Sequence, residues 1–286
     1  MASKGIDCAT PLTAEAARVL AASGHKFAAR YLVPERLTWK RLTRTEAERI
    51  TDAGMHIVSV FETTPNRPAG GTAAGTVDGK EAYQEALKIA QPGGSAIYFA
   101  VDYDSGSGDY DKIESYLKAA AAEIPGYAIG VYGSYAVIEA MAKRGAGRHF
   151  WQTYAWSGGK KSVKADLYQY KNNTRVDGTA VALDLNESYG NEGWWNTAIP
   201  ALKPSEEEMV IERDIHKVST WAAEAWEEMQ INGYFDGTRP GSGITREEAA
   251  IAVSRLRRNL LKLIADNETN IKSFEQRLQT IEKEDE

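Results

Sequence analysis

The first 200 residues alternate short β-type runs with amphipathic helical stretches, and this alternation limits the possible folds more than any other feature. Strands separated by helices form βαβ units around a parallel sheet. The predicted fold class is therefore α/β, with a (β/α)8 TIM-like barrel over residues 1–199. A doubly wound open sheet is the alternative. The eight β-type runs are residues 5–8, 26–32, 56–61, 96–101, 128–132, 150–154, 166–170 and 181–185.

Helical periodicity accompanies the earlier β-type runs but fades after the sixth. We therefore expect an abbreviated barrel whose last connections lack helices. Residues 63–79 are rich in glycine and proline, which predicts a long flexible loop at the rim, suited to form the wall of a groove. The predicted helices are residues 13–23, 45–53, 79–90, 109–123 and 134–143.

Charge is distributed unevenly along the chain. Residues 1–200 carry 22 Lys and Arg against 22 Asp and Glu, whereas residues 201–286 carry 12 against 18, which accounts for the whole net charge of 34 − 40 = −6. Without a basic face, a nucleic-acid partner is excluded. The change in charge, together with two prolines and an acidic run, predicts a linker over residues 200–212.

Three further properties constrain where the protein acts. The lone Cys8 cannot form an internal disulfide, so nothing indicates an oxidising compartment. No apolar run is long enough to span a membrane. The first residues lack the apolar stretch of a secretory signal, so no signal peptide and no export by the standard route are expected.

Acidic residues recur at the ends of the predicted strands, where barrel enzymes place their chemistry. Asp7, Glu62, Asp102 and Asp184 occupy such positions, and Asp104 follows two residues after Asp102. Side chains two residues apart on a strand share a face, so the carboxylates of Asp102 and Asp104 should repel each other. This repulsion should raise the pKa of one of the two. A protonated acid beside an anion suits glycoside hydrolysis. Alternatively, the pair caps a helix beginning in residues 105–110.

Other strand-end residues predict a sugar-binding cleft, because aromatic rings stack on the apolar faces of pyranose rings. Packing in the barrel core or rim is the alternative for each ring. The four histidines lie in separate segments without ligand spacing, so neither a metal nor another cofactor is expected. The aromatic set is Tyr31, Tyr103, Tyr132, Tyr154, Trp156 and Tyr170, and the predicted substrate-binding residues are Arg30, Tyr31, Tyr132, Tyr154, Trp156, Gln169 and Asn186.

Three motifs in residues 3–197 resemble family 25 glycoside hydrolases, the lysozymes, and still more their glycoside-hydrolase-like relatives in bacterial wall proteins and phage endolysins. These are Gly-Ile-Asp at residues 5–7, Tyr-Phe-Ala-Val-Asp-Tyr-Asp at 98–104 and Ala-Leu-Asp-Leu-Asn at 182–186. The resemblance implies cleavage of the β-1,4 bond after N-acetylmuramic acid in peptidoglycan. It also implies an enzyme stored in the host cytoplasm until lysis and acting on the cell wall.

The resemblance maps Asp7, Asp102 and Asp184 onto acidic residues of the groove, and Asp104 onto the catalytic glutamate. Aspartate is one methylene shorter than glutamate, so Glu62 is a second candidate for the acid. A bond from Glu62 to barrel hydroxyls or to Arg30 is the structural alternative. Two other functions stay open: a degenerate barrel that binds wall glycan without cleaving it, and a glycosidase for another bacterial polysaccharide.

Residues 213–258 resemble a single S-layer homology repeat, a small all-α module that binds secondary polymers of Gram-positive walls. The resemblance rests on a helix–loop–helix pattern and on Thr-Arg-Glu-Glu at residues 245–248. It implies that Trp221, Arg246 and Glu247 bind the wall polymer. A capping box and core tryptophans explain the same residues without any ligand.

The last segment, residues 259–286, repeats apolar residues at alternating spacings of four and three, with Asn267 at the one polar position. This pattern predicts a coiled-coil helix. S-layer homology repeats usually occur in threes, so a coiled coil of three chains would bring three such repeats together. A homo-oligomer, first of all a trimer, is therefore expected. An amphipathic helix folded back on the small module is the alternative. The apolar positions are Leu260, Ile264, Ile271, Phe274, Leu278 and Ile281.

Overall fold

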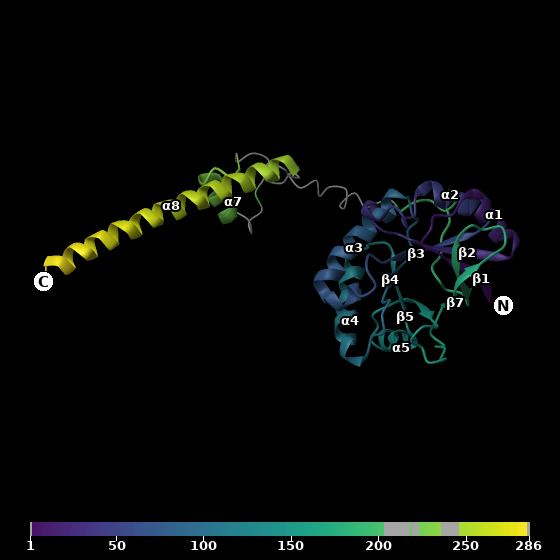
Figure 1. Ribbon diagram of the computed structural model, residues 1–286. Helices are drawn as coiled ribbons and strands as arrows, with labels where there is room; N and C mark the ends of the chain where they lie inside the picture. Colours follow the sequence, from purple (N-terminus) through teal and green to yellow (C-terminus); the bar gives the residue numbers. More distant parts are fainter. Residues whose placement is uncertain (1, 203–217, 219–222, 236–245, 285–286) are drawn as a thin grey trace. The chain divides into compact units, whose positions relative to one another are not determined.

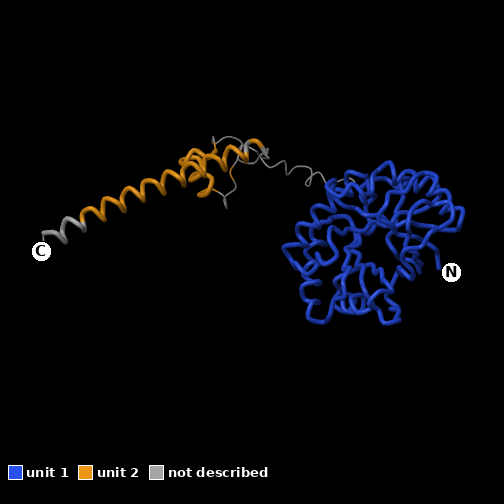
Figure 2. Tube along the Cα trace, viewed as in Figure 1, with its two compact units in different colours: residues 1–203 blue, residues 204–286 orange. Residues whose placement is uncertain are grey.

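A computed structural model describes residues 2–202, 218, 223–235 and 246–284. The chain forms two compact units, residues 1–203 and 204–286 (Figure 2). The first unit extends past the predicted barrel end at residue 199, because Leu202 packs over Gly93 and Gly126 and its amide donates to the Gln91 carbonyl at 3.2 Å. None of the described helices is long and apolar enough to cross a lipid bilayer.

The first unit is a closed barrel of eight strands paired in sequence order (Figure 1). This arrangement confirms the predicted α/β class and barrel, and it excludes the open sheet. The strands are β1 Ser3–Asp7, β2 His25–Tyr31, β3 His56–Phe61, β4 Ala96–Ala100, β5 Ala128–Gly133, β6 His149–Thr153, β7 Leu167–Arg175 and β8 Ala182–Ser188.

The last strand departs from a regular (β/α)8 barrel. Strand β8 pairs antiparallel with both β7 and β1, whereas the other neighbours pair parallel. The reason is the short connection between β7 and β8, which holds no helix, so the chain turns back there as a hairpin. The connection between β6 and β7 also lacks a helix, but those two strands pair parallel. The beginning of β8, rather than its end, therefore meets the carboxyl ends of the parallel strands. Asp184 pairs directly with Asp7 there.

Side chains alternate between two cores on either side of the barrel wall. One core fills the barrel and includes Phe27, Tyr98 and Trp151. The other lies between strands and helices and includes Ala28 and Phe99. Any strand residue near the rim therefore faces either the barrel axis or the helices. This alternation decides which of the predicted site residues share a cavity.

The α-helices of the first unit lie on the outside of the barrel (Figure 1). Thr13, Thr43 and Ser134 cap three of them through side-chain oxygens that accept from a backbone amide in the first turn. The helices are α1 Ala14–Ala22, α2 Arg44–Asp52, α3 Gly71–Lys88, α4 Tyr110–Ala122 and α5 Tyr135–Lys143.

The prediction of a flexible loop over residues 63–79 was wrong, because helix α3 begins at Gly71. Its glycines permit close packing on α4. A Cβ atom on Gly75 would lie 2.1 Å from the Tyr116 carbonyl oxygen, and one on Gly79 would lie 2.7 Å from the Ala120 carbonyl oxygen. The small residues thus serve helix packing rather than a mobile wall.

Described by itself, the second unit contains α7 Ala223–Ile231 and α8 Arg246–Glu284. The 39-residue helix α8 runs through the expected boundary at residues 258 and 259 without a break. Arg255 of α8 donates to the Gly233 carbonyl at 3.0 Å, and Trp226 stacks on Phe235 with ring centroids 5.4 Å apart. These contacts tie α7 and the following turn to the first part of α8.

Candidate active site

A cavity of about 310 Å³ opens at the carboxyl ends of the parallel strands. Four carboxylates line it, Asp7, Glu62, Asp102 and Asp184, each from a different strand or strand end. All four belong to the predicted catalytic set. The remaining lining residues are Tyr31, Val60, Ala100, Tyr132, Trp151, Thr153, Tyr154, Ala155, Trp156, Gln169 and Asn172.

Asp7 and Asp184 form one pair of carboxylates. They are cross-strand partners in the β1–β8 ladder, and directly opposed residues place their Cβ atoms about 5 Å apart. Burial, followed by the charge of Asp184, raises the pKa of Asp7 to about 7. Burial also raises the pKa of Asp184, although the Asn173 amide donates to its Oδ1 at 2.7 Å. Close to neutral pH, this pair therefore retains a proton.

Two amides hold Asp7 in place. The Gln169 Nε2 and Asn186 Nδ2 atoms donate to its Oδ2 at 2.9 and 2.6 Å. These bonds lower the pKa of Asp7, but burial and the neighbouring charge outweigh them. Since both amides occupy Oδ2, a proton on this carboxyl belongs on Oδ1.

Glu62 and Asp102 form a second pair, beside the cation Lys40. Lys40 Nζ lies 3.9 Å from Glu62 Oε1 and 4.4 Å from the centre of the Tyr31 ring. Burial raises the pKa of both carboxyls, whereas the charge of Lys40 acts in the opposite direction on each. The two pairs therefore differ in environment: Lys40 lies beside this pair, whereas no cation among the described residues acts on Asp7 or Asp184.

A buried hydrogen-bond network connects the cavity walls. Tyr132 Oη and Thr153 Oγ1 donate to Gln169 Oε1 at 3.1 and 2.8 Å. Trp151 Nε1 donates to Asn186 Oδ1 at 2.9 Å. Each amide thus accepts on its oxygen and donates to Asp7 from its nitrogen, which fixes the orientation of both.

Aromatic residues gather at the opening of the cavity. Tyr154 and Trp156, both predicted to bind sugar, line it and remain partly exposed. Trp156 adopts a left-handed backbone conformation with φ of 52°, which is uncommon for a bulky residue and consistent with a functional constraint. Tyr103 and Tyr170 do not line the cavity, and Tyr103 packs against the core outside the barrel.

Three predicted site residues of the barrel do not line the cavity, although one of them, Asn186, is hydrogen-bonded to Asp7. Asp104 is exposed and does not line the cavity, because β4 ends at Ala100 and the chain turns, so alternation no longer places it with Asp102. Arg30 is also outside the cavity. It alternates with Tyr31 on β2, faces the helices and pairs with Glu46 at 2.6 Å. The alternative bond between Arg30 and Glu62 is therefore wrong as well.

Sequence reasoning missed several members of the site. The inward orientation of Trp151 and Thr153 can be deduced from the alternation of side chains along β6, once the bounds of the strand are known. Lys40 lies in the irregular segment after β2, where no periodicity marks it, although it is 95% buried. Among the described residues, no group of three or more His, Cys, Asp or Glu side chains is placed to hold a metal ion.

The predicted wall-polymer residues are only partly described. Trp221 lies outside the described residues. Arg246 is the first residue of α8, with its backbone alone described, and Glu247 is exposed on the same helix. The prediction that these three residues bind a wall polymer therefore stays a prediction.

The closed barrel thus carries four carboxylates where its parallel strands end. The chain belongs to the family described as Rv2525c-like, glycoside hydrolase-like domain, whose model matches residues 18–188, more than half of the chain. The predicted relationship to glycoside hydrolases is thereby confirmed at the level of the family.

Sequence relatives include YbfG of Bacillus subtilis, 35% identical over 151 residues, and FadG of the same organism, 28% identical over 160 residues. These matches cover 44% and 50% of this chain, but only 20% and 27% of the relatives. The chain therefore corresponds to about a quarter of their length.

Among solved structures, the Tat-secreted protein Rv2525c of Mycobacterium tuberculosis matches with a TM-score of 0.61 and 24% identity, over 68% of this chain and 98% of that one. This similarity supports the fold. Family 25 lysozymes and an endolysin catalytic domain also match, with TM-scores below 0.5.

Proposed function

We propose that the protein hydrolyses the glycan chains of Gram-positive peptidoglycan as an N-acetylmuramidase of the endolysin type. One observation carries this proposal: two pairs of carboxylates line one cavity, and among the described residues a cation, Lys40, lies beside just one of them. Glycoside hydrolysis requires a carboxylic acid to protonate the leaving oxygen and a carboxylate to stabilise or attack the sugar cation. Different environments allow two carboxyls to take these two roles.

In this proposal, Asp7 donates the proton. Its pKa of about 7 keeps a large fraction protonated at neutral pH. Glu62 and Asp102 take the anionic role, because the charge of Lys40 favours their ionised forms against the burial that raises the pKa of both. Gln169 and Asn186 orient the acid, and the rings of Tyr154 and Trp156 hold neighbouring sugars.

The test measures loss of turbidity and new reducing ends from purified Gram-positive walls. Asp7→Asn and Glu62→Gln should each lower the rate by about 10²–10⁴-fold, the usual contribution of a positioned acid or base. Asp104→Asn should retain activity, because this exposed carboxyl lies outside the cavity. Loss of activity in Asp104→Asn alone would instead assign the acid to Asp104.

A second function, glycan binding without cleavage, is favoured by one feature. Asp104 occupies the position of the lysozymes' catalytic glutamate in the sequence resemblance, yet it lies outside the cavity. Under this alternative, the wild type sediments with walls and releases no reducing ends. Release of reducing ends by the wild type would eliminate it.

For the second unit, we propose wall-polymer binding through Trp221, Arg246 and Glu247, together with assembly through α8. Four apolar residues of the predicted coiled-coil seam, Leu260, Ile264, Ile271 and Phe274, are exposed on α8. A helix of 39 residues with such a stripe is typical of a coiled coil. Light scattering of the full chain should give about three times 31.4 kDa, and removal of residues 259–286 should return the monomer mass. A full-length monomer would refute the assembly.

A further inference from the structure

The buried ion pair between Arg30 and Glu46 lies outside the cavity. It contacts the segment that follows Asp7 and the segment that contains Lys40. Arg30 is fully buried on β2, and Glu46 is buried on α2. Arg30 Nε lies 2.6 Å from Glu46 Oε1, and Arg30 Nη2 lies 3.4 Å from Oε2. Such a fork fixes the plane of the guanidinium group.

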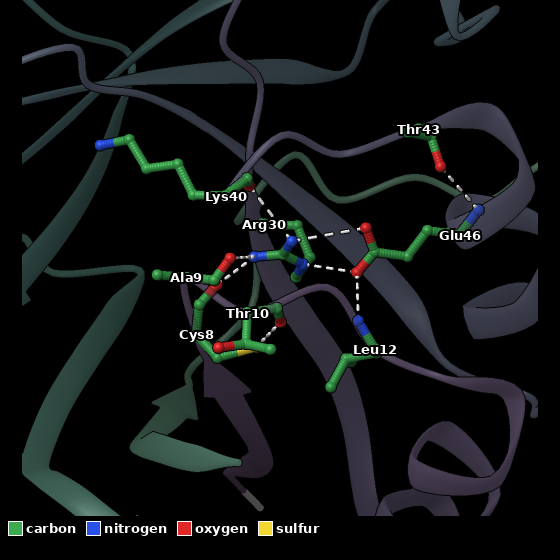
Figure 3. Close-up of polar contacts among 8 residues, drawn as sticks. All are labelled: Cys8, Ala9, Thr10, Leu12, Arg30, Lys40, Thr43 and Glu46. Carbon is green, nitrogen blue, oxygen red and sulfur yellow. Dashed lines mark hydrogen bonds and ion pairs between the residues drawn. The ribbon is translucent and has the colours of Figure 1, made fainter. Parts of the chain in front are cut away.

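The other side of the guanidinium group binds backbone carbonyls (Figure 3). Arg30 Nη1 donates to the Cys8 carbonyl and, at 3.2 Å, to the Ala9 carbonyl. These two residues directly follow Asp7. Arg30 Nη2 donates to the Lys40 carbonyl at 3.2 Å. One guanidinium group therefore joins the segment after β1 to the segment after β2.

Glu46 extends the same network. Its Oε1 accepts from the Leu12 amide at 2.7 Å, so it holds the far end of the segment that begins at Cys8. Helix α2 is itself anchored by Thr43, whose hydroxyl accepts from the Glu46 amide at 3.2 Å. In Figure 3, the Lys40 side chain extends away from this network while its backbone is held within it.

We infer that Arg30 and Glu46 are positioning residues that fix Lys40 against Glu62 in the cavity. Lys40 lies in an irregular segment, so its backbone needs external support to bring Nζ to 3.9 Å from Glu62 Oε1. The carbonyl bond from Arg30 provides this support, along with the Leu42 amide bond to the Tyr31 carbonyl at 2.7 Å. The catalytic consequence rests on the proposed function, whereas the positioning is testable without it.

The test is the titration of the Glu62 carboxyl in the free full-length protein, followed by carbon-detected NMR. The groups that act on Glu62 are Lys40, Asp102 and Tyr31. Lys40→Met removes the cation and should move the Glu62 titration upward by about half a pH unit or more, a threefold change in the ionisation equilibrium. The double variant Arg30→Met/Glu46→Leu, which leaves no unpaired buried charge, should shift it in the same direction.

Two comparisons separate positioning from general support. In a protein that already carries Lys40→Met, the double change at Arg30 and Glu46 should not shift the Glu62 titration further, because it acts through Lys40. Leu20→Ala, which opens a cavity under α1, should lower the stability without moving the Glu62 titration. An unchanged titration in the double variant, or an equal shift in Leu20→Ala, overturns the inference.

Arg30→Lys provides a second route if the double variant does not fold. Lysine keeps a charge beside Glu46 but cannot reach all the carbonyls that the guanidinium fork binds. It should shift the Glu62 titration upward by less than Lys40→Met does, and no shift contradicts the inference. Because the readout needs no substrate, failure of wall hydrolysis would refute the proposed function and leave this result standing.

Discussion

Replacing Asp7 with asparagine should stabilise the barrel at neutral pH, although Asp7 is the proposed acid. Burial and the charge of Asp184 raise its pKa in the folded protein from the ordinary 3.8 to about 7. A carboxyl with a raised pKa favours folding only while it is protonated. As the pH rises from the unfolded value towards the folded value, the folded state therefore loses stability relative to the unfolded chain.

The magnitude follows from the shift. A pKa shift of about three units, at about 1.4 kcal/mol per unit, lowers the free energy of unfolding by roughly 4 kcal/mol. This loss is complete above pH 7 and mostly absent near pH 4. Asparagine has nearly the same shape and keeps an oxygen for the amides of Gln169 and Asn186, but it cannot ionise. The variant should therefore gain stability over the wild type as the pH rises.

Urea unfolding of the full chain, followed by near-ultraviolet circular dichroism near pH 4.5 and near pH 8, measures this gain. Asp104→Asn is the matched control, because it makes the same change at an exposed carboxyl and should alter stability by about 0.5 kcal/mol or less. A gain for Asp7→Asn that is absent at the higher pH, or equal at both, would refute the reasoning.

Two other measurements probe the site and the helix packing. The rate of wall hydrolysis should fall as the pH rises through about 7, because Asp7 loses its proton there. The rate should also fall at acidic pH, because Glu62 becomes protonated. A rate that still increases well above pH 7 would contradict the role of Asp7 as the acid. Gly75→Ala should destabilise the barrel by about 1–3 kcal/mol despite the better helix propensity of alanine, because the new Cβ meets the Tyr116 carbonyl. Gly108→Ala, with nothing near its Cβ, is the control for urea unfolding, and equal stability of the two variants would contradict this packing.

The strand order and the acidic rim could be predicted because they depend on local patterns. Alternating β-type runs indicated the barrel, and acids that follow apolar strands indicated the rim. The direction of β8 depended on the length of the connection before it, not on the strand itself. Asp184 therefore reached the cavity from the beginning of an antiparallel strand, a position that its sequence alone does not reveal.

Arg30 and Lys40 show why the rest of the site could not be predicted. Arg30 and Tyr31 are neighbours at the end of one strand, but alternation allows only Tyr31 to face the cavity. Lys40 comes from an irregular segment whose course depends on bonds to Arg30, 10 residues earlier, and to Tyr31, which no local pattern marks. Residues 71–79 look like a loop by composition, and only the closeness of α4 explains their glycines.

The central claim is that the cavity carboxylates cleave glycan chains after N-acetylmuramic acid. Digestion of purified Gram-positive walls, followed by borohydride reduction of the new ends and mass spectrometry, tests it most directly. We predict reduced muramic acid from the wild type and a large loss of it from Asp7→Asn. Reduced glucosamine alone, or no reduced sugar from a wild-type protein that still binds the walls, would contradict the claim.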